Sequence, residues 1–490
     1  MKFPLLGKVF AVSVFALGLT IVLARIGFLV DERAERQQEA VRSVQQSQAG
    51  AQTVLGPLLQ RQCAEEWDST VGEGKDKKKV VEKREFLVQA TPDNLRISTV
   101  LNNEPRYRGL FKVNGYVGHF ALEADWASAH AMRPVAERAD GRLKCQPAVL
   151  LLALGDVRGV RQAKAVVQGT ELAVEPGTQH AEYTQGFHVT LPAPWPLAED
   201  KAAVTARIEL ELVGTARLAV VPAANATTWK LSADWPHPSF GGRFLPTDHH
   251  ISDAGFEAQW KVSSLASAAP KQVLDDSPLC EPSTASSATD SEDQRYGSAV
   301  AATAGAAKGC VDTLAVAFID PVNPYMLSDR ATKYGLLFIA LTFVAVALVE
   351  VLGQGRVRRV HPVQYALVGL ALTLFFLLLL SLSEHFAFWI AYAAASTACV
   401  TLLGTYTAHM LGQRKAGLLF ASAMALLYGL MYVLLQREQT ALVIGSVGLF
   451  TAVAAVMWLT RRVDWYRLFE DARGVPEGRP APVPQEPTAP

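Results

Sequence analysis

The residues Gly335–Leu352 read GLLFIALTFVAVALVEVL, and this run decides the fold class of the 490-residue chain. An uninterrupted apolar run of about 18 residues or more is typical of a helix that crosses a lipid bilayer, where the backbone must satisfy its own hydrogen bonds. Further runs of the same kind follow it. We therefore predict a five-helix transmembrane domain over residues 335–460, with spans at Gly335–Leu352, Gln364–Leu382, Phe386–Thr407, Ala416–Leu435 and Thr440–Leu459.

Another apolar run lies near the N-terminal end, where Val9–Val30 reads VFAVSVFALGLTIVLARIGFLV. Lys2 and Lys8 supply a basic start, so a cleavable signal peptide is the alternative interpretation. The run is longer than an ordinary signal core, and the polar segment after it has no clear small-x-small cleavage site. We predict an uncleaved transmembrane anchor at residues 9–30, followed by a polar helix over Asp31–Gln52.

Basic residues in the connecting loops orient the predicted spans. Arginine and lysine gather in alternate loops, and such loops stay on the cytoplasmic side of the membrane. Six spans then place residues 1–8 and the proline-rich tail 461–490 in the cytoplasm, and residues 31–333 in the periplasm. The basic loop residues are Arg356, Arg358, Arg359, Arg414, Lys415, Arg461 and Arg462.

The segment 31–333 contains short stretches in which apolar and polar residues alternate, such as TARIELELV. Period-two alternation, β-branched residues and intervening Gly, Pro, Asn and Asp predict a mostly-β, sandwich-like domain. The whole chain is then an α + β membrane protein. The pattern alone leaves open whether there is one sandwich or two. The expected strands are Val80–Ala90, Arg108–Phe120, Ala148–Leu154, Gly186–Leu191, Thr205–Val213, Ala216–Pro222, Gly255–Leu265 and Asp312–Ile319.

Residues 277–308 interrupt this pattern with a stretch rich in Ser, Ala, Thr and Asp. Such a composition has little to bury, so we predict a flexible insertion. Cys280 and Cys310 bracket it, and an oxidising compartment favours a disulfide between them. The four cysteines of the expected periplasmic domain, which include Cys63 and Cys145, allow three pairings.

Composition and spacing exclude several classes of function. The 46 basic and 46 acidic residues cancel, which argues against a generally basic nucleic-acid-binding protein. The absence of any Cys-x-x-Cys pair excludes a zinc ribbon, and Cys399, within a predicted span, is expected to pack without reacting. Some His and Asp residues offer metal donors, but their spacing matches no common zinc motif, and we predict no metal and no cofactor. These residues are Asp234, His237, Asp248, His249, His250 and Asp253.

Three polar residues of the membrane domain form a candidate polar membrane site. Glu384 and His385, beside two serines, invite a hydrolase or proton-relay interpretation. Adjacent helical residues diverge by about 100°, so Glu384 is poorly placed to orient His385, and no G-x-S-x-G motif accompanies them. A polar turn between two spans is the simpler interpretation. Glu350 is either an ion-coupling carboxylate or the partner of Arg356 or of the other loop arginines at the membrane interface.

Several blocks of the sequence stand in a characteristic order. They are DERAERQQEA at residues 31–40, LGPLL at Leu55–Leu59, GDVRG at Gly155–Gly159, DWPHPSFGGRFLPTDHHISDAGFEAQWKVSSLA at Asp234–Ala266 and FIDPVNPYMLSDRATKYGLLFIALTF at Phe318–Phe343. On this topology, they resemble the CreD family of bacterial inner-membrane proteins. The resemblance implies a role in cell envelope integrity and stress, in some bacteria within a two-component regulon that responds to β-lactams. It implies no established reaction and offers no catalytic residues.

Two hypotheses of function follow. The first is a non-enzymatic sensing or scaffolding module whose partners are the lipid bilayer and envelope proteins or cell-wall components, with no nucleic acid. The alternative is a membrane-embedded enzyme or transporter that acts on an envelope component, although the spans lack the interrupted helices typical of transporters. The Lys75–Lys79 run is either a solvated turn or a contact with an anionic lipid or polymer.

Overall fold

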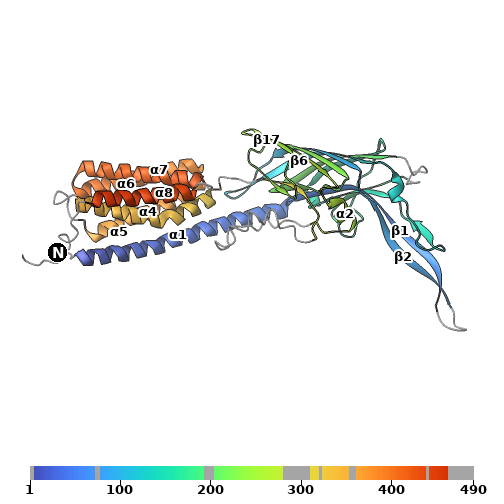
Figure 1. Cartoon of the computed structure of the whole chain (residues 1–490), viewed down its shortest axis with the longest axis horizontal. Helices are drawn as coiled ribbons and strands as arrows, with labels where there is room; N and C mark the ends of the chain where they lie inside the picture. Colours follow the sequence, from blue (N-terminus) through green and yellow to red (C-terminus); the bar gives the residue numbers. More distant parts are fainter. Residues whose placement is uncertain are drawn as a thin grey trace, which may run out of the picture. The chain divides into compact units, whose positions relative to one another are not determined.

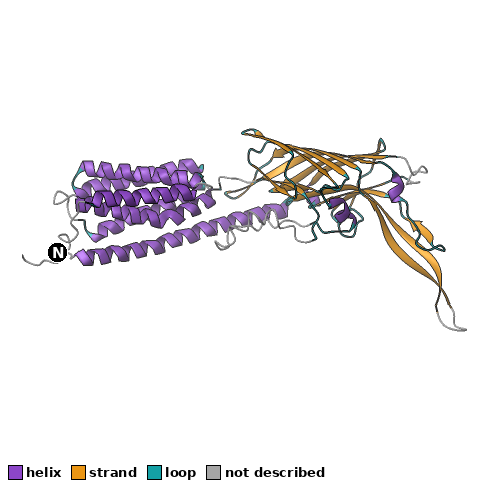
Figure 2. Cartoon of the chain, viewed as in Figure 1, coloured by secondary structure: helices purple, strands orange, loops and turns teal. Residues whose placement is uncertain are grey.

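The computed structural model describes residues 5–71, 78–192, 203–279, 309–318, 323–352, 360–437 and 441–461. These residues form two compact units. One comprises Met1–Gln37 and Val322–Pro490, and the other comprises Gln38–Pro321. Figure 2 shows that helices make up the first unit and that strands dominate the second. The predicted class, an α + β membrane protein, is confirmed.

The N-terminal helix α1 runs without a break over Leu5–Ser47, a length of 43 residues. It joins the predicted anchor to the predicted polar helix, because the segment after Val30 is rich in Glu, Arg, Gln and Ala, which favour a helix. The polar helix ends at Ser47 rather than at Gln52, since Gln52 already begins a strand.

Five helices follow the strands (Figure 1), and the first four of them share one apolar core with the N-terminal helix. The first of them begins eleven residues before the predicted apolar run, because its polar first turns are compatible with a helix although they carry no hydropathy signal. Together with α1, they make six described helices long and apolar enough to cross a membrane. The five are α4 Pro324–Leu352, α5 Pro362–Ser383, α6 Phe388–Leu411, α7 Arg414–Gln436 and α8 Ala441–Thr460.

Aromatic rings and one thiol fill the middle of the bundle. The Tyr392 hydroxyl donates to the Tyr428 carbonyl at 2.6 Å, and the Tyr428 hydroxyl donates to Cys399 Sγ at 3.1 Å. The Phe375 ring packs 4.6 Å from that of Tyr428, centroid to centroid. Cys399 is buried and unpaired, so it serves as a packing residue whose sulfur accepts a hydrogen bond.

The second unit is a single β-sandwich, which settles the question that the pattern left open. One continuous core of buried apolar side chains lies between its two large sheets. The first sheet has the order β11-β12-β8-β1-β14-β19-β16, with β2 and β7 also paired to β1. Its strands are β1 Gln52–Val71, β2 Lys78–Ala90, β7 Arg142–Cys145, β8 Val149–Leu154, β11 Glu175–Pro176, β12 Gly186–Thr190, β14 Arg217–Val220, β16 Pro238–Gly242 and β19 Leu314–Phe318.

The second sheet has the order β10-β9-β13-β6-β3-β15-β18-β17. Its strands alternate between buried and exposed residues, as expected when one face of a sheet packs on a core. They are β3 Asn94–Asn103, β6 Gly115–Trp126, β9 Val160–Val167, β10 Thr170–Leu172, β13 Val204–Thr215, β15 Ala226–Ala233, β17 Asp248–Ser252 and β18 Gly255–Ser263.

Several features of the domain differ from the sequence prediction, which also lacks the strands β3, β9 and β15. The single strand predicted at Arg108–Phe120 is wrong. The structure has a small hairpin of β4 Arg106–Arg108 and β5 Phe111–Val113 there, and β6 begins at Gly115. The turn residues between these strands were hidden within an apparently continuous alternation. The longest strand, β1, was not predicted at all, because its Gly56–Pro57 pair is typical of a turn.

Strand β1 tolerates Gly56–Pro57 because the ladder with β8 contains an irregularity there. The register between the two strands shifts between Leu55 and Leu58. Leu59 faces the sandwich core, whereas Leu55 and Leu58 face a second apolar cluster on the outer side of the sheet. The short helix α2, Ala269–Leu274, contributes to that outer cluster. A β-bulge of this kind keeps the strand in the sheet while changing which side chains face inward.

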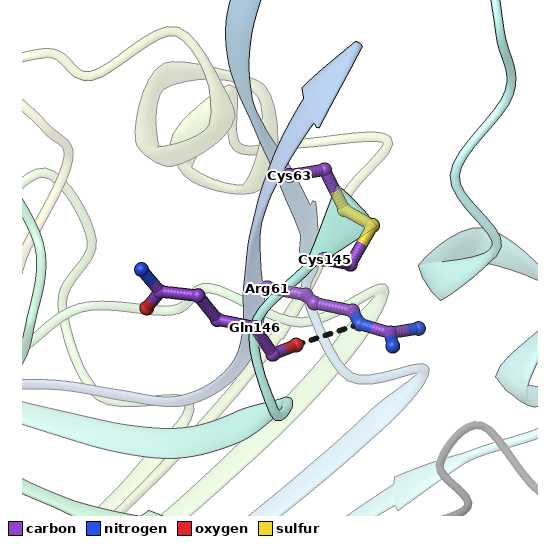
Figure 3. The surroundings of a disulfide bond; sticks show 4 residues. All are labelled: Arg61, Cys63, Cys145 and Gln146. Atoms are coloured by element: carbon purple, nitrogen blue, oxygen red, sulfur yellow. Dashed lines mark hydrogen bonds between the residues drawn. A yellow bond between two sulfur atoms is a disulfide. The ribbon is translucent and has the colours of Figure 1, made fainter. Parts of the chain in front are cut away.

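A disulfide joins Cys63 of β1 to Cys145 of β7 (Figure 3). Beside it, the Arg61 guanidinium donates through Nε to the Gln146 carbonyl at 2.9 Å. Of the three possible pairings, this bond is compatible only with the one that also joins Cys280 to Cys310. Cys280 lies outside the described residues, as does most of the predicted insertion 277–308. The Cys280–Cys310 bond therefore stays a prediction.

The GDVRG block ties the end of α1 to the sandwich within the second unit. Arg158 donates to the Gln45 and Gln46 carbonyls in the last turn of the helix, and it also pairs with Asp156 at 2.6 Å. Burial acts to raise the pKa of Asp156, but hydrogen bonds from Arg158 and from the Gly50 amide outweigh it, and the pKa is lowered. A cation at the C-terminal end of a helix is also favoured by the helix dipole.

The backbone of Gly159 lies close to that of Val213, and this contact can be tested by mutation. A Cβ at this position would lie 2.2 Å from the Val213 carbonyl oxygen, which belongs to the backbone of β13 and cannot rotate away. We expect Gly159→Ala to destabilise the β domain by about 1–3 kcal/mol. Gly241→Ala is the matched control, since a Cβ there meets nothing within 4 Å. Thermal unfolding of the purified full chain, followed by tryptophan fluorescence, measures both; equal melting temperatures would contradict the expectation.

Candidate functional site

Glu350, near the end of α4, forms an ion pair with Lys8 of α1. Lys8 Nζ lies 2.6 and 2.5 Å from the two carboxylate oxygens. The Tyr365 hydroxyl donates to Glu350 at 3.1 Å, and the Val360 amide donates at 3.3 Å. The sequence suggested Arg356 as the partner, but that residue lies outside the described residues. The carboxylate is thus engaged by a helix that precedes it by more than 300 residues.

Glu384, just after the last turn of α5, has a corresponding role at the other end of the bundle. Its Oε1 lies 3.5 Å from Arg33 Nε of α1 and 3.5 Å from the Tyr325 hydroxyl of α4. The Glu384 side chain is only 9% exposed, so this contact lies largely out of solvent. Close by, the Asn323 side-chain amide donates to Gln37 Oε1 at 3.1 Å. Glu384 therefore connects three helices.

His385 does not join Glu384 in a catalytic arrangement. Its ring is exposed, and Nδ1 lies 3.2 Å from the Ser381 carbonyl oxygen of the preceding turn. The buried Ser383 hydroxyl donates to the Leu380 carbonyl at 2.9 Å. Serine, histidine and glutamate are thus each bonded to a different group. Glu384 and His385 lie in a turn that follows α5.

The two ion pairs are spaced to match a lipid bilayer. Arg33 follows Lys8 by 25 residues on one helix, or about 37 Å at 1.5 Å per residue. The hydrocarbon core of a bilayer is about 30 Å thick. In a bilayer, this spacing would place each pair near one boundary of the apolar layer, where long cationic side chains reach the headgroups.

Close apolar packing holds α1 against the bundle between the two pairs. Leu19, Leu23 and Ile26 are buried in the same core as the side chains of α4 and α5. At Gly369 of α5, a Cβ would lie 2.1 Å from Leu19 Cδ1, so the absence of a side chain there makes room for the leucine. Small residues at helix contacts are typical of membrane bundles. The predicted anchor therefore packs as an additional helix of the membrane domain, beside the five that follow the strands.

The histidines and aspartates of the Asp234–Ala266 block lie at different places in the sandwich. His249 and His250 are exposed on the edge strand β17. The His249 ring contacts that of Phe240, at a centroid distance of 5.5 Å, and Asp234 accepts a hydrogen bond from the Asn103 amide at 2.6 Å. Within the described parts of the chain, no three His, Cys, Asp or Glu side chains gather in a group that could hold a metal ion.

The described residues of each unit enclose a hollow. A polar cleft of about 600 Å³ lies in the second unit, between the last turns of α1 and the GDVRG turn, and Arg42, Gln45 and Gln185 line it. An apolar groove of about 710 Å³ runs along α5 and α6 from Ser381 to Tyr406. The groove is lined mostly by leucine and alanine, so its chemistry suits lipid chains rather than a polar substrate.

Comparison with known proteins agrees with this arrangement of helices and strands. The family model described as "Inner membrane protein CreD" matches residues 4–466. The chain belongs to the CreD family. It is 33% identical over 468 residues to Inner membrane protein CreD of Escherichia coli (strain K12), a match that covers 95% of each chain. Membership in this family, together with six candidate spans, makes it a multi-pass inner-membrane protein.

A solved structure also matches part of the chain at low similarity. It is an M1 zinc metallopeptidase variant from Deinococcus radiodurans with a bound peptide substrate. The match has 13% sequence identity and a TM-score of 0.20, and it covers 35% of this chain and 38% of that one. We draw nothing about the CreD family from it.

The Lys8–Glu350 pair can be tested with a double-mutant cycle. Replacing either residue with Gln leaves a partly buried charge without its partner, so the two single variants and the double variant should not be additive. We expect a coupling of about 1.5–3 kcal/mol, as for hydrogen bonds to charged groups. The measurement is the free energy of unfolding in detergent. Lys415→Gln combined with Glu350→Gln is the control, because Lys415 is exposed, and this pair should be additive.

Proposed function

We propose that this CreD-family protein is a non-enzymatic sensing or scaffolding protein that supports cell envelope integrity and the response to envelope stress. In this proposal, the β-sandwich lies in the periplasm and both termini are cytoplasmic. The proposal rests on the ion pairs that Glu350 and Glu384 form. Both membrane-domain carboxylates suggested by the sequence are engaged by cations of α1.

A catalytic or ion-coupling carboxylate needs access to a substrate or to protons. Glu350 already has three partners, namely Lys8, Tyr365 and the Val360 amide. Glu384 contacts Arg33 and Tyr325 with little exposed surface. Both carboxylates join neighbouring helices to one another, which is a structural role for a charged residue in a membrane. This arrangement favours a scaffold over a transporter or an enzyme.

The β domain supplies the surface for partners in this proposal. Strands β1 and β2 pair over thirteen residues and form a long hairpin, which Figure 1 shows extending from the sandwich. Its sides carry exposed Val80 and Val81, with the basic residues of Lys75–Lys79 nearby in the sequence. Envelope proteins and cell-wall components are the partners that we propose, and the bilayer surrounds the helices.

Reporter fusions test the proposed orientation. A reporter that is active only in the periplasm should work when fused after Gly141 or Gln436 and fail after Gly355 or Gly412. The reason is that the basic loops retain the latter two positions in the cytoplasm. Enzymatic activity of the reporter is the readout, with immunoblots to confirm equal expression. Activity after Gly355 would overturn the orientation and, with it, the periplasmic role.

Variants at the end of α5 distinguish the scaffold from a membrane enzyme. His385→Ala should be nearly silent, because the exposed ring keeps water as a partner. Glu384→Gln should lower the amount of folded protein and the envelope phenotype together, because Arg33 loses its counter-charge. The measurements are protein abundance in membranes and survival under envelope stress.

The alternative function predicts a different pattern for the same two variants. If Glu384 or His385 took part in catalysis or proton transfer, its variant would lose the phenotype while the abundance of folded protein stayed normal. That outcome for either variant would replace the scaffold proposal with the membrane enzyme or transporter. Glu384→Asp is the matched variant for charge, since it retains the carboxylate that binds Arg33.

A further inference from the structure

A fully buried histidine, His180, lies in the turn between β11 and β12 of the sandwich. Its side chain has no exposed surface, and its ring stacks on that of Tyr183 at a centroid distance of 4.6 Å. The turn contains no motif that the sequence singled out. A buried imidazole needs a partner for each ring nitrogen, so these partners define what the residue does.

The hydrogen bonds at Nδ1 fix the protonation state of the ring. The backbone amides of Glu182 and Tyr183 both donate to Nδ1, each at 3.1 Å. An atom that accepts from two N–H groups carries no proton. The neutral ring therefore carries its proton on Nε2, which lies 3.3 Å from Asp276 Oδ1. The Gln89 side-chain nitrogen lies 2.7 Å from Nε2, and since two donors cannot bond to each other, the amide of Gln89 must turn its oxygen toward the ring to accept this proton.

The same turn holds the segment that follows α2. The Tyr183 hydroxyl donates to the Ser277 carbonyl at 2.7 Å, and the Val311 amide donates to the Pro278 carbonyl at 3.2 Å. The Tyr183 ring is buried in the outer apolar cluster together with Val273 of α2. The position of Tyr183, and hence of this segment, depends on the turn that His180 closes.

We propose that His180 is a proton-operated switch: a second proton on its ring breaks both backbone hydrogen bonds at Nδ1 and opens the turn Gly177–Gln185 away from the segment Asp275–Leu279. The step takes one proton from solvent onto Nδ1 and needs no other reactant. The amides of Glu182 and Tyr183 then face an N–H group instead of an acceptor, so the closed turn cannot keep its hydrogen bonds.

The ionisable groups around the ring act in opposite directions. Burial lowers the pKa of His180 and outweighs the carboxylates of Asp276 and Glu182, which act to raise it. The neighbouring Tyr183 has a raised pKa and stays neutral. Strand β2 presents the neutral amide of Gln89. On β12, the His188 ring lies beside Glu175 and bonds to Gln179, one residue before His180.

The sign of the pH dependence follows from the lowered pKa. The open turn exposes the ring, whose pKa then returns to about 6.5, so the open state binds a proton more readily than the closed state. The closed turn is therefore fully stable above about pH 6.5 and weakens as the pH falls below it. The open population should rise up to about tenfold for each pH unit below that value.

Amide hydrogen exchange of the full chain in detergent micelles tests the switch. Protection factors correct for the intrinsic pH dependence of exchange. Between pH 6.5 and 5.5 they should fall by up to about fivefold in the peptides covering Gly177–Gln185 and Asp275–Leu279. Peptides from β8 should not change. His180→Asn should keep the protection but lose its pH dependence, because an asparagine oxygen can accept the same backbone amides.

His250→Asn, at an exposed histidine on β17, is the matched control and should respond like the wild type. An unchanged wild-type protection at pH 5.5, or a wild-type response in His180→Asn, overturns the proposal. If the Asn variant leaves the turn open at every pH, deuterium exchange at the imidazole C2 atom of the wild type decides. Its inflection for His180 must coincide with the opening of the turn, and an inflection at a separate pH overturns the switch.

Discussion

The pairing of α1 with the bundle at both of its ends is the constraint on which the membrane domain depends. Apolar helices gain little from association in lipid, so packing and polar contacts select the partners. Lys8–Glu350 and Arg33–Glu384 form together only when α1 has one rotation and one depth. A slip of one residue turns the helix by about 100° and separates both pairs. Leu19 at Gly369 enforces the same register from the middle of the helix.

The sequence was sufficient for those parts of the fold that depend on local pattern. All six spans could be predicted because an apolar run of membrane length needs no knowledge of its neighbours. Strand β13 could also be predicted, from its alternation of apolar and polar residues. Strand β1 was not, since its Gly56–Pro57 pair fits a strand only where the ladder with β8 is irregular. That irregularity is a property of two strands, and a single segment cannot reveal it.

The same distinction between local pattern and distant contacts applies to the candidate sites. Glu350 and Glu384 stood out because charge is rare in apolar segments, but their partners on α1 lie hundreds of residues away and could not be inferred from spacing. His180 gave no signal, because neither its burial nor its two backbone donors are visible in the sequence. The metal-donor types near His249 attracted attention by composition, yet they lie on an exposed edge strand.

The way the chain leaves and re-enters the sandwich beside α2 has a practical consequence for protein engineering. The Val311 amide binds the Pro278 carbonyl, and the Gln272 side chain bonds to the backbone of both Cys310 and Asp312. The two chain ends are thus held by the domain itself, independently of the length of chain between them. Doubling such a length costs only about 0.6 kcal/mol in closure entropy. We therefore expect an affinity tag inserted between Leu279 and Gly309 to leave the core unchanged.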